Sequence, residues 1–140
     1  MADTFDIEIA TPERLLAREK AVRAQIPAKD GYIGVLPGHA PLLAELGIGA
    51  LTYTTPDDHR YSLAIRGGFI EIYENVVRVL SDVAEKGQEI DVSQAEKDLK
   101  QAQEAMINPN LGMDIAAALT AALHAQARID AARKAANHEE

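Results

Sequence analysis

Few side chains in this sequence are of the types that carry out catalysis or bind metals. The 140 residues include no cysteine, which excludes thiol nucleophiles, disulfide frameworks and cysteine-ligated metal clusters. The four histidines are His39, His59, His124 and His138, and no two of them have the spacing of metal ligands. Sequence motifs of serine hydrolases, zinc proteases and P-loop proteins are absent. We therefore expect no catalytic residues and no metal site.

The acidic composition makes partners with negatively charged surfaces unfavourable. Fourteen Lys and Arg residues against 22 Asp and Glu residues give a formal charge of −8, which repels nucleic-acid phosphates and anionic lipid headgroups. We expect no nucleic-acid partner and no direct insertion into lipid. The sequence also predicts neither a signal peptide nor a membrane span, because no basic region precedes an apolar core and no apolar stretch approaches about 18 residues.

The most distinctive segment covers residues 31–43, GYIGVLPGHAPLL. Its two prolines fix φ, and its three glycines allow conformations that other residues avoid. These residues predict an irregular, rigid loop between two strands, with apolar side chains around it. From the residues alone, a plain turn is the alternative to a binding role.

The elements that must position this loop are short strands. Runs of alternating or β-branched residues lie at 5–9, 22–26, 48–54, 61–65, 69–73 and 76–83. Glu74 and Asn75 predict a two-residue hairpin turn between the last two runs. The spacing of strands and turns predicts an all-β sandwich or flattened barrel of about ten short strands over residues 1–86.

Residues 87–140 predict an antiparallel pair of α-helices. Asp91 or Ser93 can cap the first helix, whose apolar stripe runs over residues 92–106. The segment 108–112, NPNLG, ends this helix, and Asp114 caps the second. The apolar stripe of the second helix consists of Ile115, Ala118, Ala122, Ala125, Ile129 and Ala132, widened by Leu119 and Leu123.

The hairpin has little apolar surface to bury, because alanine dominates both stripes. A buried methyl contributes about 0.8 kcal/mol and a large aliphatic side chain about 1.5–3 kcal/mol, whereas ordering one residue costs about 1–2 kcal/mol. A helical segment with weak docking can detach and remain helical, so we expect a two-state element. A static hairpin that caps the sandwich is the alternative.

Residues 34–43, GVLPGHAPLL, resemble the epsilon subunit of bacterial F-type ATP synthases, which is called delta in mitochondria. Supporting segments lie at 9–13, 67–72 and 77–82, and with the alanine-rich hairpin the resemblance covers nearly the whole chain. It implies a non-catalytic rotor subunit of the central stalk, which couples c-ring rotation to ATP synthesis through the gamma subunit. It also implies a peripheral location at the cytoplasmic face of the bacterial inner membrane.

The resemblance assigns two contacts to the sandwich. The expected gamma-binding residues are Pro37, Gly38, His39, Ala40, Pro41 and Leu42. The expected contact with the polar loops of the c-ring consists of Asp30, Gly31 and Tyr32. Tyr32 stands where some relatives have a second carboxylate, which weakens the electrostatic part of this contact.

The resemblance gives the hairpin, residues 87–140, a regulatory role. In the family it folds against the sandwich or extends along gamma to the alpha and beta subunits, where it restrains ATP hydrolysis. The corresponding contacts here are Arg128, Arg133 and Lys134. Four acidic residues lie between positions 114 and 140, so we expect weak or conditional inhibition.

Some relatives bind ATP through an Ile/Leu-Asp-x-x-Arg-Ala motif at the start of the first helix. Here Ile90 and Asp91 match the motif, but Gln94 replaces the arginine. A neutral amide cannot make the charge-assisted contact that a guanidinium makes with phosphate. We therefore expect no cofactor; an ATP-sensing module is the alternative function.

Overall fold

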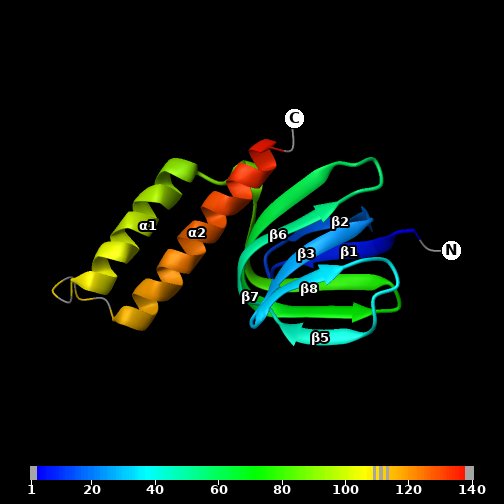
Figure 1. The fold of residues 1–140 in the computed structure, drawn as a ribbon, viewed down its shortest axis with the longest axis horizontal. Helices are drawn as coiled ribbons and strands as arrows, with labels where there is room; N and C mark the ends of the chain where they lie inside the picture. Colours follow the sequence, from blue (N-terminus) through cyan, green and yellow to red (C-terminus); the bar gives the residue numbers. More distant parts are fainter. Residues whose placement is uncertain (1–2, 109, 111, 113, 138–140) are drawn as a thin grey trace.

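The computed structural model describes residues 3–108, 110, 112 and 114–137. Within these residues, strands come first and helices follow (Figure 1). The strands are β1 Phe5–Ala10, β2 Leu15–Ala21, β3 Arg23–Ala28, β4 Gly31–Val35, β5 Leu42–Glu45, β6 Ile48–Thr54, β7 Arg60–Tyr73 and β8 Val76–Lys86. The helical elements are the 3₁₀ turn η1 Gly87–Glu89, then α1 Val92–Ile107 and α2 Ile115–Asn137.

The predicted all-β sandwich followed by an antiparallel helical hairpin is confirmed, but the number of strands is wrong. The described residues form eight strands rather than about ten. The runs at 61–65 and 69–73, which predict two strands, are the two halves of the 14-residue strand β7. The Gly67–Gly68 pair between them bends the strand without ending it.

The bend in β7 makes one hydrogen-bonded sheet into a sandwich. The strand order is β2-β1-β8-β7-β6-β3-β4, and β5 pairs with β7 off this path. The first half of β7 pairs with β6 and the second half with β5. Gly67 and Gly68 have φ values of +70° and +106°, and a Cβ at Gly68 would lie 2.0 Å from the carbonyl oxygen of Leu80. Only glycine fits this bend.

The segment 31–43 is more regular than predicted. Residues 31–35 form β4 and residues 42–45 form β5, so the irregular loop covers only residues 36–41. The expectation of a loop over the whole segment is therefore wrong, because β4 finds a complete antiparallel partner in β3 and β5 finds one in β7. The predicted turn at Glu74 and Asn75 is confirmed, with positive φ at both residues.

The core of the sandwich is mainly aliphatic and lies within the strands and the turns between them. Its largest fully buried side chains include Phe5, Ile7, Ile26, Leu51 and Ile70. All members of this cluster lie between residues 5 and 79, so the helices contribute nothing to it.

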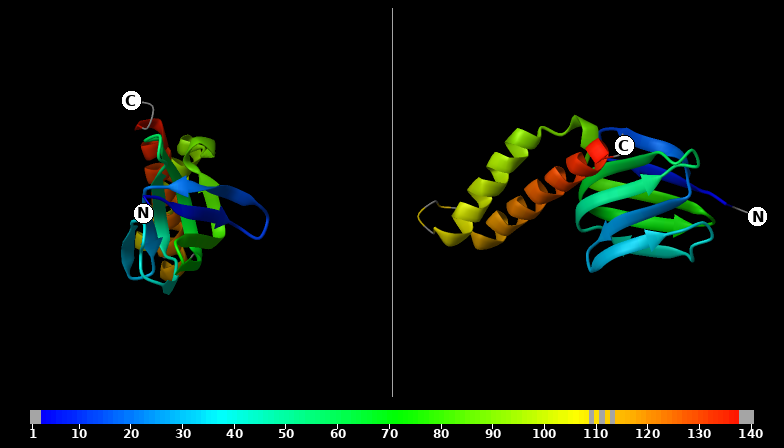
Figure 2. Two further views of the ribbon diagram at one scale, coloured as in Figure 1. Left: turned by 90° about the vertical axis from the view of Figure 1, so that its right-hand side faces the viewer. Right: turned by 45° about the horizontal axis from the view of Figure 1, so that its top comes forward.

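In the hairpin, α2 packs between α1 and the sandwich (Figures 1 and 2). The side chains of Asp91 and Asp114 accept hydrogen bonds from the backbone N–H groups of Gln94 and Ala117, which confirms the two predicted caps. Of the predicted stop signal NPNLG, Pro109 and Leu111 lie outside the described residues, as do His138 and the C-terminal glutamates.

The apolar face of α2 differs from the prediction. Ala118, Ala122, Ala125, Ile129 and Ala132 are buried as expected. Ile115, Leu119 and Leu123 are exposed instead, because a second, alanine-lined side of the helix faces the sandwich. That side presents Ala127 and Ala131 to a small cluster formed by Ala50, Ala64 and Ile90.

Small residues allow α2 to approach the sandwich closely. A Cβ at Gly87 would lie 2.4 Å from the carbonyl oxygen of Ala131, and 2.8 Å from the hydroxyl of Ser62. The buried Ser62 hydroxyl donates a hydrogen bond of 2.6 Å to the same carbonyl. The contact area is therefore narrow and depends on close fit rather than on large side chains.

An arginine connects three elements at this interface. The guanidinium of Arg128 donates two hydrogen bonds, of 2.7 and 3.2 Å, to the carboxylate of Glu85 on β8. Its Nη1 also lies 3.7 Å from a carboxylate oxygen of Asp98 on α1. Since the Arg128 side chain is only 16% exposed, this bidentate pair is shielded from solvent.

His124 lies beside this ion pair. Its Nδ1 is 3.4 Å from Nη1 of Arg66 on β7, and the half-buried ring also faces Arg128, Glu85 and Asp98. Burial and the positive charge of Arg66 hold the pKa of His124 below its ordinary value of 6.5. The carboxylates act in the opposite direction but already neutralise Arg128. The docked hairpin therefore favours neutral His124.

Filling the space at Gly87 should weaken docking of the hairpin. We expect Gly87→Ala to cost about 1–3 kcal/mol of docking free energy, because the added methyl overlaps the Ala131 carbonyl and overpacking costs this much. Amide hydrogen exchange should accelerate about fivefold or more in α2, while β1 and β8 stay protected. Gly34→Ala is the control, since its Cβ would meet only the flexible Gln25 side chain at 3.3 Å. Equal protection of α2 in both variants would contradict this close fit.

Acidification should also weaken docking. A pKa that is lower in the docked state stabilises that state above pH 6.5, and this contribution is lost as the pH falls through the lowered pKa. We expect the docked population, measured from the NMR amide resonances of Ser62 and Ala131, to fall between pH 7.5 and 5.5. His124→Gln should abolish this dependence and His39→Gln should keep it. A pH profile unchanged by His124→Gln would assign the effect to another group.

Candidate functional site

The loop at residues 36–41 is held in a fixed shape by its own backbone and by a neighbouring turn. The backbone N–H of Gly38 donates to the Asn75 side chain over 2.9 Å, which ties the loop to the β7–β8 turn. The N–H of His39 donates to the carbonyl of Leu36, and Nδ1 of His39 lies 2.7 Å from the carbonyl oxygen of Ala40. His39 thus braces the loop, whose rim at Gly38, Ala40 and Pro41 is exposed.

An exposed apolar row crosses the outer face of the neighbouring strands. Strand pairing places Phe69 of β7 beside Leu80 of β8, Leu80 beside Ala10 of β1, and Ala10 beside Leu15 of β2. Phe69 and Leu80 are each 55% exposed, and Leu15 is 50% exposed. We call these four residues the apolar row. Because they alternate with buried core residues, their side chains point into solvent.

A row of alternating charges runs parallel to the apolar row. Arg78 of β8 lies 3.2 Å from Glu71 of β7 and 3.9 Å from Glu8 of β1, and Glu8 lies 3.7 Å from Arg18 of β2. Leu43 of β5, which is 72% exposed, pairs with Glu71 at the end of this row. The outer face therefore offers an apolar strip flanked by fixed charges, which is the composition of a protein–protein contact.

The residues expected to meet the c-ring lie at the other end of β4 from the loop. Lys29 and Asp30 form the turn between β3 and β4, and the Asp30 side chain is exposed. The Tyr32 hydroxyl accepts a 3.1 Å hydrogen bond from the backbone N–H of Ala50, so the ring lies along β6. The intervening five residues of β4 separate the turn from the 36–41 loop by about 16 Å.

The three cations predicted on the last helix do not form one group in the docked hairpin. Arg128 is held by Glu85 and Asp98, as described above. Arg133 and Lys134 are exposed, and they line different grooves.

In the docked hairpin, the side chains of Ile90 and Asp91 are engaged within the chain. The Ile90 side chain is buried against the sandwich, and the Asp91 carboxylate caps α1 by accepting from the Gln94 backbone. The Gln94 side chain donates to Asp98 over 2.8 Å. These contacts satisfy the polar groups of the segment within the chain and leave a carboxylate, rather than a cation, at its surface.

The apolar row is the feature that sequence reasoning missed. Alternation in each strand could reveal that Phe69, Leu80 and Leu15 point outwards, but only strand pairing makes them neighbours. Among the described residues, no three side chains of His, Asp or Glu gather as metal ligands. Neither described helix is long and apolar enough to cross a membrane.

Comparison with known proteins agrees with the resemblance seen in the sequence. Residues 4–87 match the family model of the ATP synthase Delta/Epsilon chain beta-sandwich domain. The ATP synthase epsilon chain of Solibacter usitatus is 51% identical over 134 residues, covering 96% of this chain and 99% of the relative. The family model covers the sandwich, and the similarity to this relative extends over both the sandwich and the hairpin.

Two solved structures share the fold. A chain from the Euglena gracilis mitochondrial ATP synthase, described as OSCP/F1/c-ring, superposes with a TM-score of 0.75 at 23% identity. The superposition covers 99% of this chain and 84% of the Euglena chain. A chain from the Tetrahymena thermophila mitochondrial ATP synthase, described as central stalk/c-ring, gives a TM-score of 0.57 at 17% identity, covering 93% and 94%.

The family model spans more than half of the chain, and the bacterial relative is similar along nearly all of it. The chain therefore belongs to the epsilon chains of ATP synthase, the non-catalytic family that residues 34–43 resemble.

Proposed function

We propose that this chain is a rotor subunit in the central stalk of a proton-translocating ATP synthase, where it joins the gamma subunit to the c-ring. The structural relatives come from assemblies described as central stalk/c-ring and OSCP/F1/c-ring. The proposed location is peripheral, at the cytoplasmic face of the bacterial inner membrane. The observation that carries the proposal is the apolar row on the rigid sandwich.

The gamma subunit, in this proposal, binds the outer face that carries the apolar row. Phe69, Leu80 and Leu15 are half-exposed and contribute little to the stability of the isolated chain. A partner that covers them removes their apolar surface from water, which contributes favourable free energy to binding. Leu42, the first residue of β5, packs partly against the core, and the next residue, Leu43, is exposed on the outer face beside Glu71. Residues 37–42 then form one border of the same contact, with the braced loop shape favouring a fixed orientation.

The c-ring contact is proposed for the turn at Asp30, Gly31 and Tyr32. The exposed Asp30 carboxylate can meet a basic loop, while the Tyr32 hydroxyl is engaged with β6 and leaves the ring edge for apolar contact. Because β4 separates this turn from the 36–41 loop, gamma and the c-ring can bind at the same time.

The hairpin, residues 87–140, is proposed to be the regulatory part. Large apolar side chains at Ile107, Ile115, Leu119 and Leu123 are exposed, and the end of the hairpin that carries Ile107 and Ile115 projects away from the sandwich (Figure 2). A second position of the hairpin against the alpha and beta subunits would cover them. Arg128 is released from Glu85 only when the hairpin detaches, so its charge becomes available together with Arg133 and Lys134.

Substitutions in the apolar row test the gamma contact. The double variant Phe69→Thr and Leu80→Thr keeps β-forming residues and should change stability little, because both side chains are half-exposed. We expect gamma binding to weaken about tenfold or more, as for the loss of central apolar anchors. Surface plasmon resonance with immobilised gamma subunit measures it.

Leu123→Thr is the matched control, since Leu123 is 48% exposed but lies on α2. It should bind gamma like the natural sequence. Unchanged affinity of the double variant, with circular dichroism showing an intact fold, would place gamma on another face.

Removing residues 88–140 tests whether the sandwich alone binds gamma and the c-ring while the hairpin only regulates hydrolysis. Since the sandwich core lies between residues 5 and 79, the truncated chain should fold and co-purify with gamma and the c-ring. ATP hydrolysis by the reconstituted complex should rise only modestly, because acidic residues oppose the three cations of the last helix. A truncated chain that folds but no longer binds gamma would overturn this division.

A further inference from the structure

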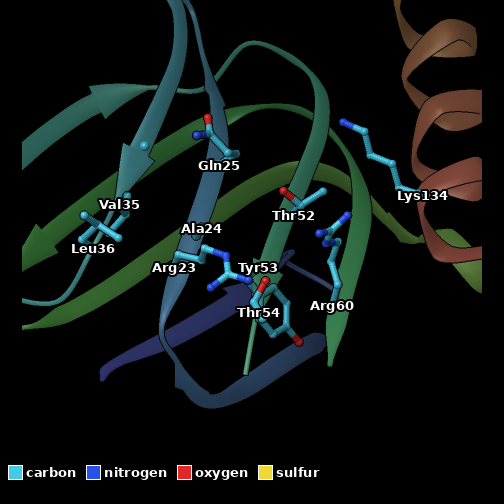
Figure 3. Close-up of a pocket in the computed structure, with 11 residues that line it drawn as sticks. Arg23, Ala24, Gln25, Val35, Leu36, Thr52, Tyr53, Thr54, Arg60 and Lys134 are labelled. Atoms are coloured by element: carbon cyan, nitrogen blue, oxygen red, sulfur yellow. The ribbon is translucent and has the colours of Figure 1, made fainter. Parts of the chain in front are cut away.

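The pairing of β3 with β6 stops before either strand ends. Gln25 of β3 and Thr52 of β6, both drawn in Figure 3, form the last pair of this ladder. Continuing the same register would place Pro27 opposite Ala50. Proline has no backbone N–H, and the carbonyl of Pro27 instead accepts a 3.0 Å hydrogen bond from the N–H of Gly47. The ladder between β3 and β6 therefore does not extend to Ala50.

The Tyr32 hydroxyl takes the place of the missing strand pair. Every second residue of β6 directs its backbone groups to the same side, and the Thr54 carbonyl accepts from the N–H of Val22, the residue before β3. The N–H of Ala50 therefore points towards β3, and it donates a 3.1 Å hydrogen bond to the hydroxyl oxygen of Tyr32. Tyr32 lies on β4, where it is the cross-strand partner of Pro27. One side chain thus joins β4 to β6 across the end of β3.

Gly49 of β6 makes room for this contact. A Cβ at Gly49 would lie 2.5 Å from the Tyr32 hydroxyl oxygen and 2.9 Å from the Cβ of Pro27. A hydroxyl and a proline ring that are packed this closely against one glycine have little freedom to shift. The Tyr32 side chain is therefore fixed at its hydroxyl end, although the residue is 55% exposed.

The turn that carries Asp30 is anchored on both sides. Before Asp30, the backbone N–H of Lys29 donates a 3.0 Å hydrogen bond to the carbonyl of Glu45 on β5. After Asp30, Gly31 has a φ of +134°, and the next residue is Tyr32. Because glycine allows many backbone conformations, the hydrogen bond of Tyr32 is what limits the turn on this side. The direction of the exposed Asp30 carboxylate therefore depends on that hydrogen bond.

We propose that Tyr32 is a positioning residue, whose hydroxyl fixes the direction in which Asp30 presents its carboxylate to the c-ring. This inference rests on the proposed contact of Asp30 with the c-ring, but it assigns the Tyr32 hydroxyl to the sandwich rather than to the partner. A carboxylate that is already held in one direction loses less conformational entropy on binding a basic loop than a mobile one does.

Nuclear magnetic resonance on the isolated full chain tests the positioning. In Tyr32→Phe the ring remains but the acceptor of the Ala50 N–H is lost, so we expect amide exchange of Ala50 to accelerate about fivefold or more. The backbone order parameters of Asp30 and Gly31 should fall from about 0.85 towards 0.6. Tyr73→Phe is the matched control, since Tyr73 is 56% exposed and lies at the end of β7, and it should change neither quantity. Unchanged order parameters in Tyr32→Phe would overturn the proposal, whether or not Asp30 binds the c-ring.

Binding to the purified c-ring, measured by surface plasmon resonance, tests the consequence. Tyr32→Phe should weaken this binding about two- to tenfold, the loss expected for one neutral hydrogen bond. Its binding to gamma should stay unchanged, which a general loss of the fold would not allow. Because the effect acts through the carboxylate, Tyr32→Phe should change the c-ring affinity by less than about twofold in an Asp30→Asn background.

Equal weakening by Tyr32→Phe in both backgrounds would show that Tyr32 contacts the c-ring directly, and would overturn its positioning role. Unchanged c-ring affinity of Tyr32→Phe, where Asp30→Asn alone weakens binding, would overturn it as well. If Asp30→Asn leaves the affinity unchanged while the order parameters fall as expected, the proposed c-ring contact is wrong and the positioning of the turn stands.

Discussion

The bend of β7 at Gly67 and Gly68 is the constraint on which the rest of the structure depends. At Gly68 the backbone passes so close to the carbonyl of Leu80 that no Cβ can be accommodated. The bend lets one strand pair with β6 in its first half and with β5 in its second. The bend closes the sheet around the core. The outer face of the first half of β7 is covered by α2, whereas the outer face of the second half carries the apolar row and the row of charges beside it.

The core of the sandwich and its contact with α2 differ in the amount of apolar surface that they bury. The core is fully buried and mainly aliphatic, and close-packed cores of this kind make the sandwich a rigid support. The contact with α2 consists mainly of alanine methyl groups, which contribute about 0.8 kcal/mol each, a buried serine hydroxyl and the Arg128–Glu85 pair. A contact of this composition is sensitive to single groups. The protonation of His124 and the close fit at Gly87 both act on the same narrow interface.

Local features of the fold could be predicted because they depend on neighbouring residues. Asp91 and Asp114 cap helices, Glu74 and Asn75 make a tight turn, and alternation identifies buried strand residues such as Ile7 and Ile70. The number of strands was wrong because Gly67 and Gly68 resemble a chain break, and only the pairing of β7 with two different partners shows a bend. The burial of Leu119 and Leu123 was wrong because helical periodicity does not say how many sides of α2 are covered.

The sequence by itself determined the family, through the segment at residues 34–43, and the division into strands followed by helices. Those features depend on the types and spacing of residues close together in the chain. Only the tertiary structure decided that Ala10, Phe69 and Leu80 adjoin in one row, and that Arg128 faces Glu85. It also decided that the Tyr32 hydroxyl meets the backbone of Ala50 where β3 and β6 separate. The physical reason is that strand register and helix docking join residues far apart in sequence, and each is selected by the packing of the whole core rather than by any local preference.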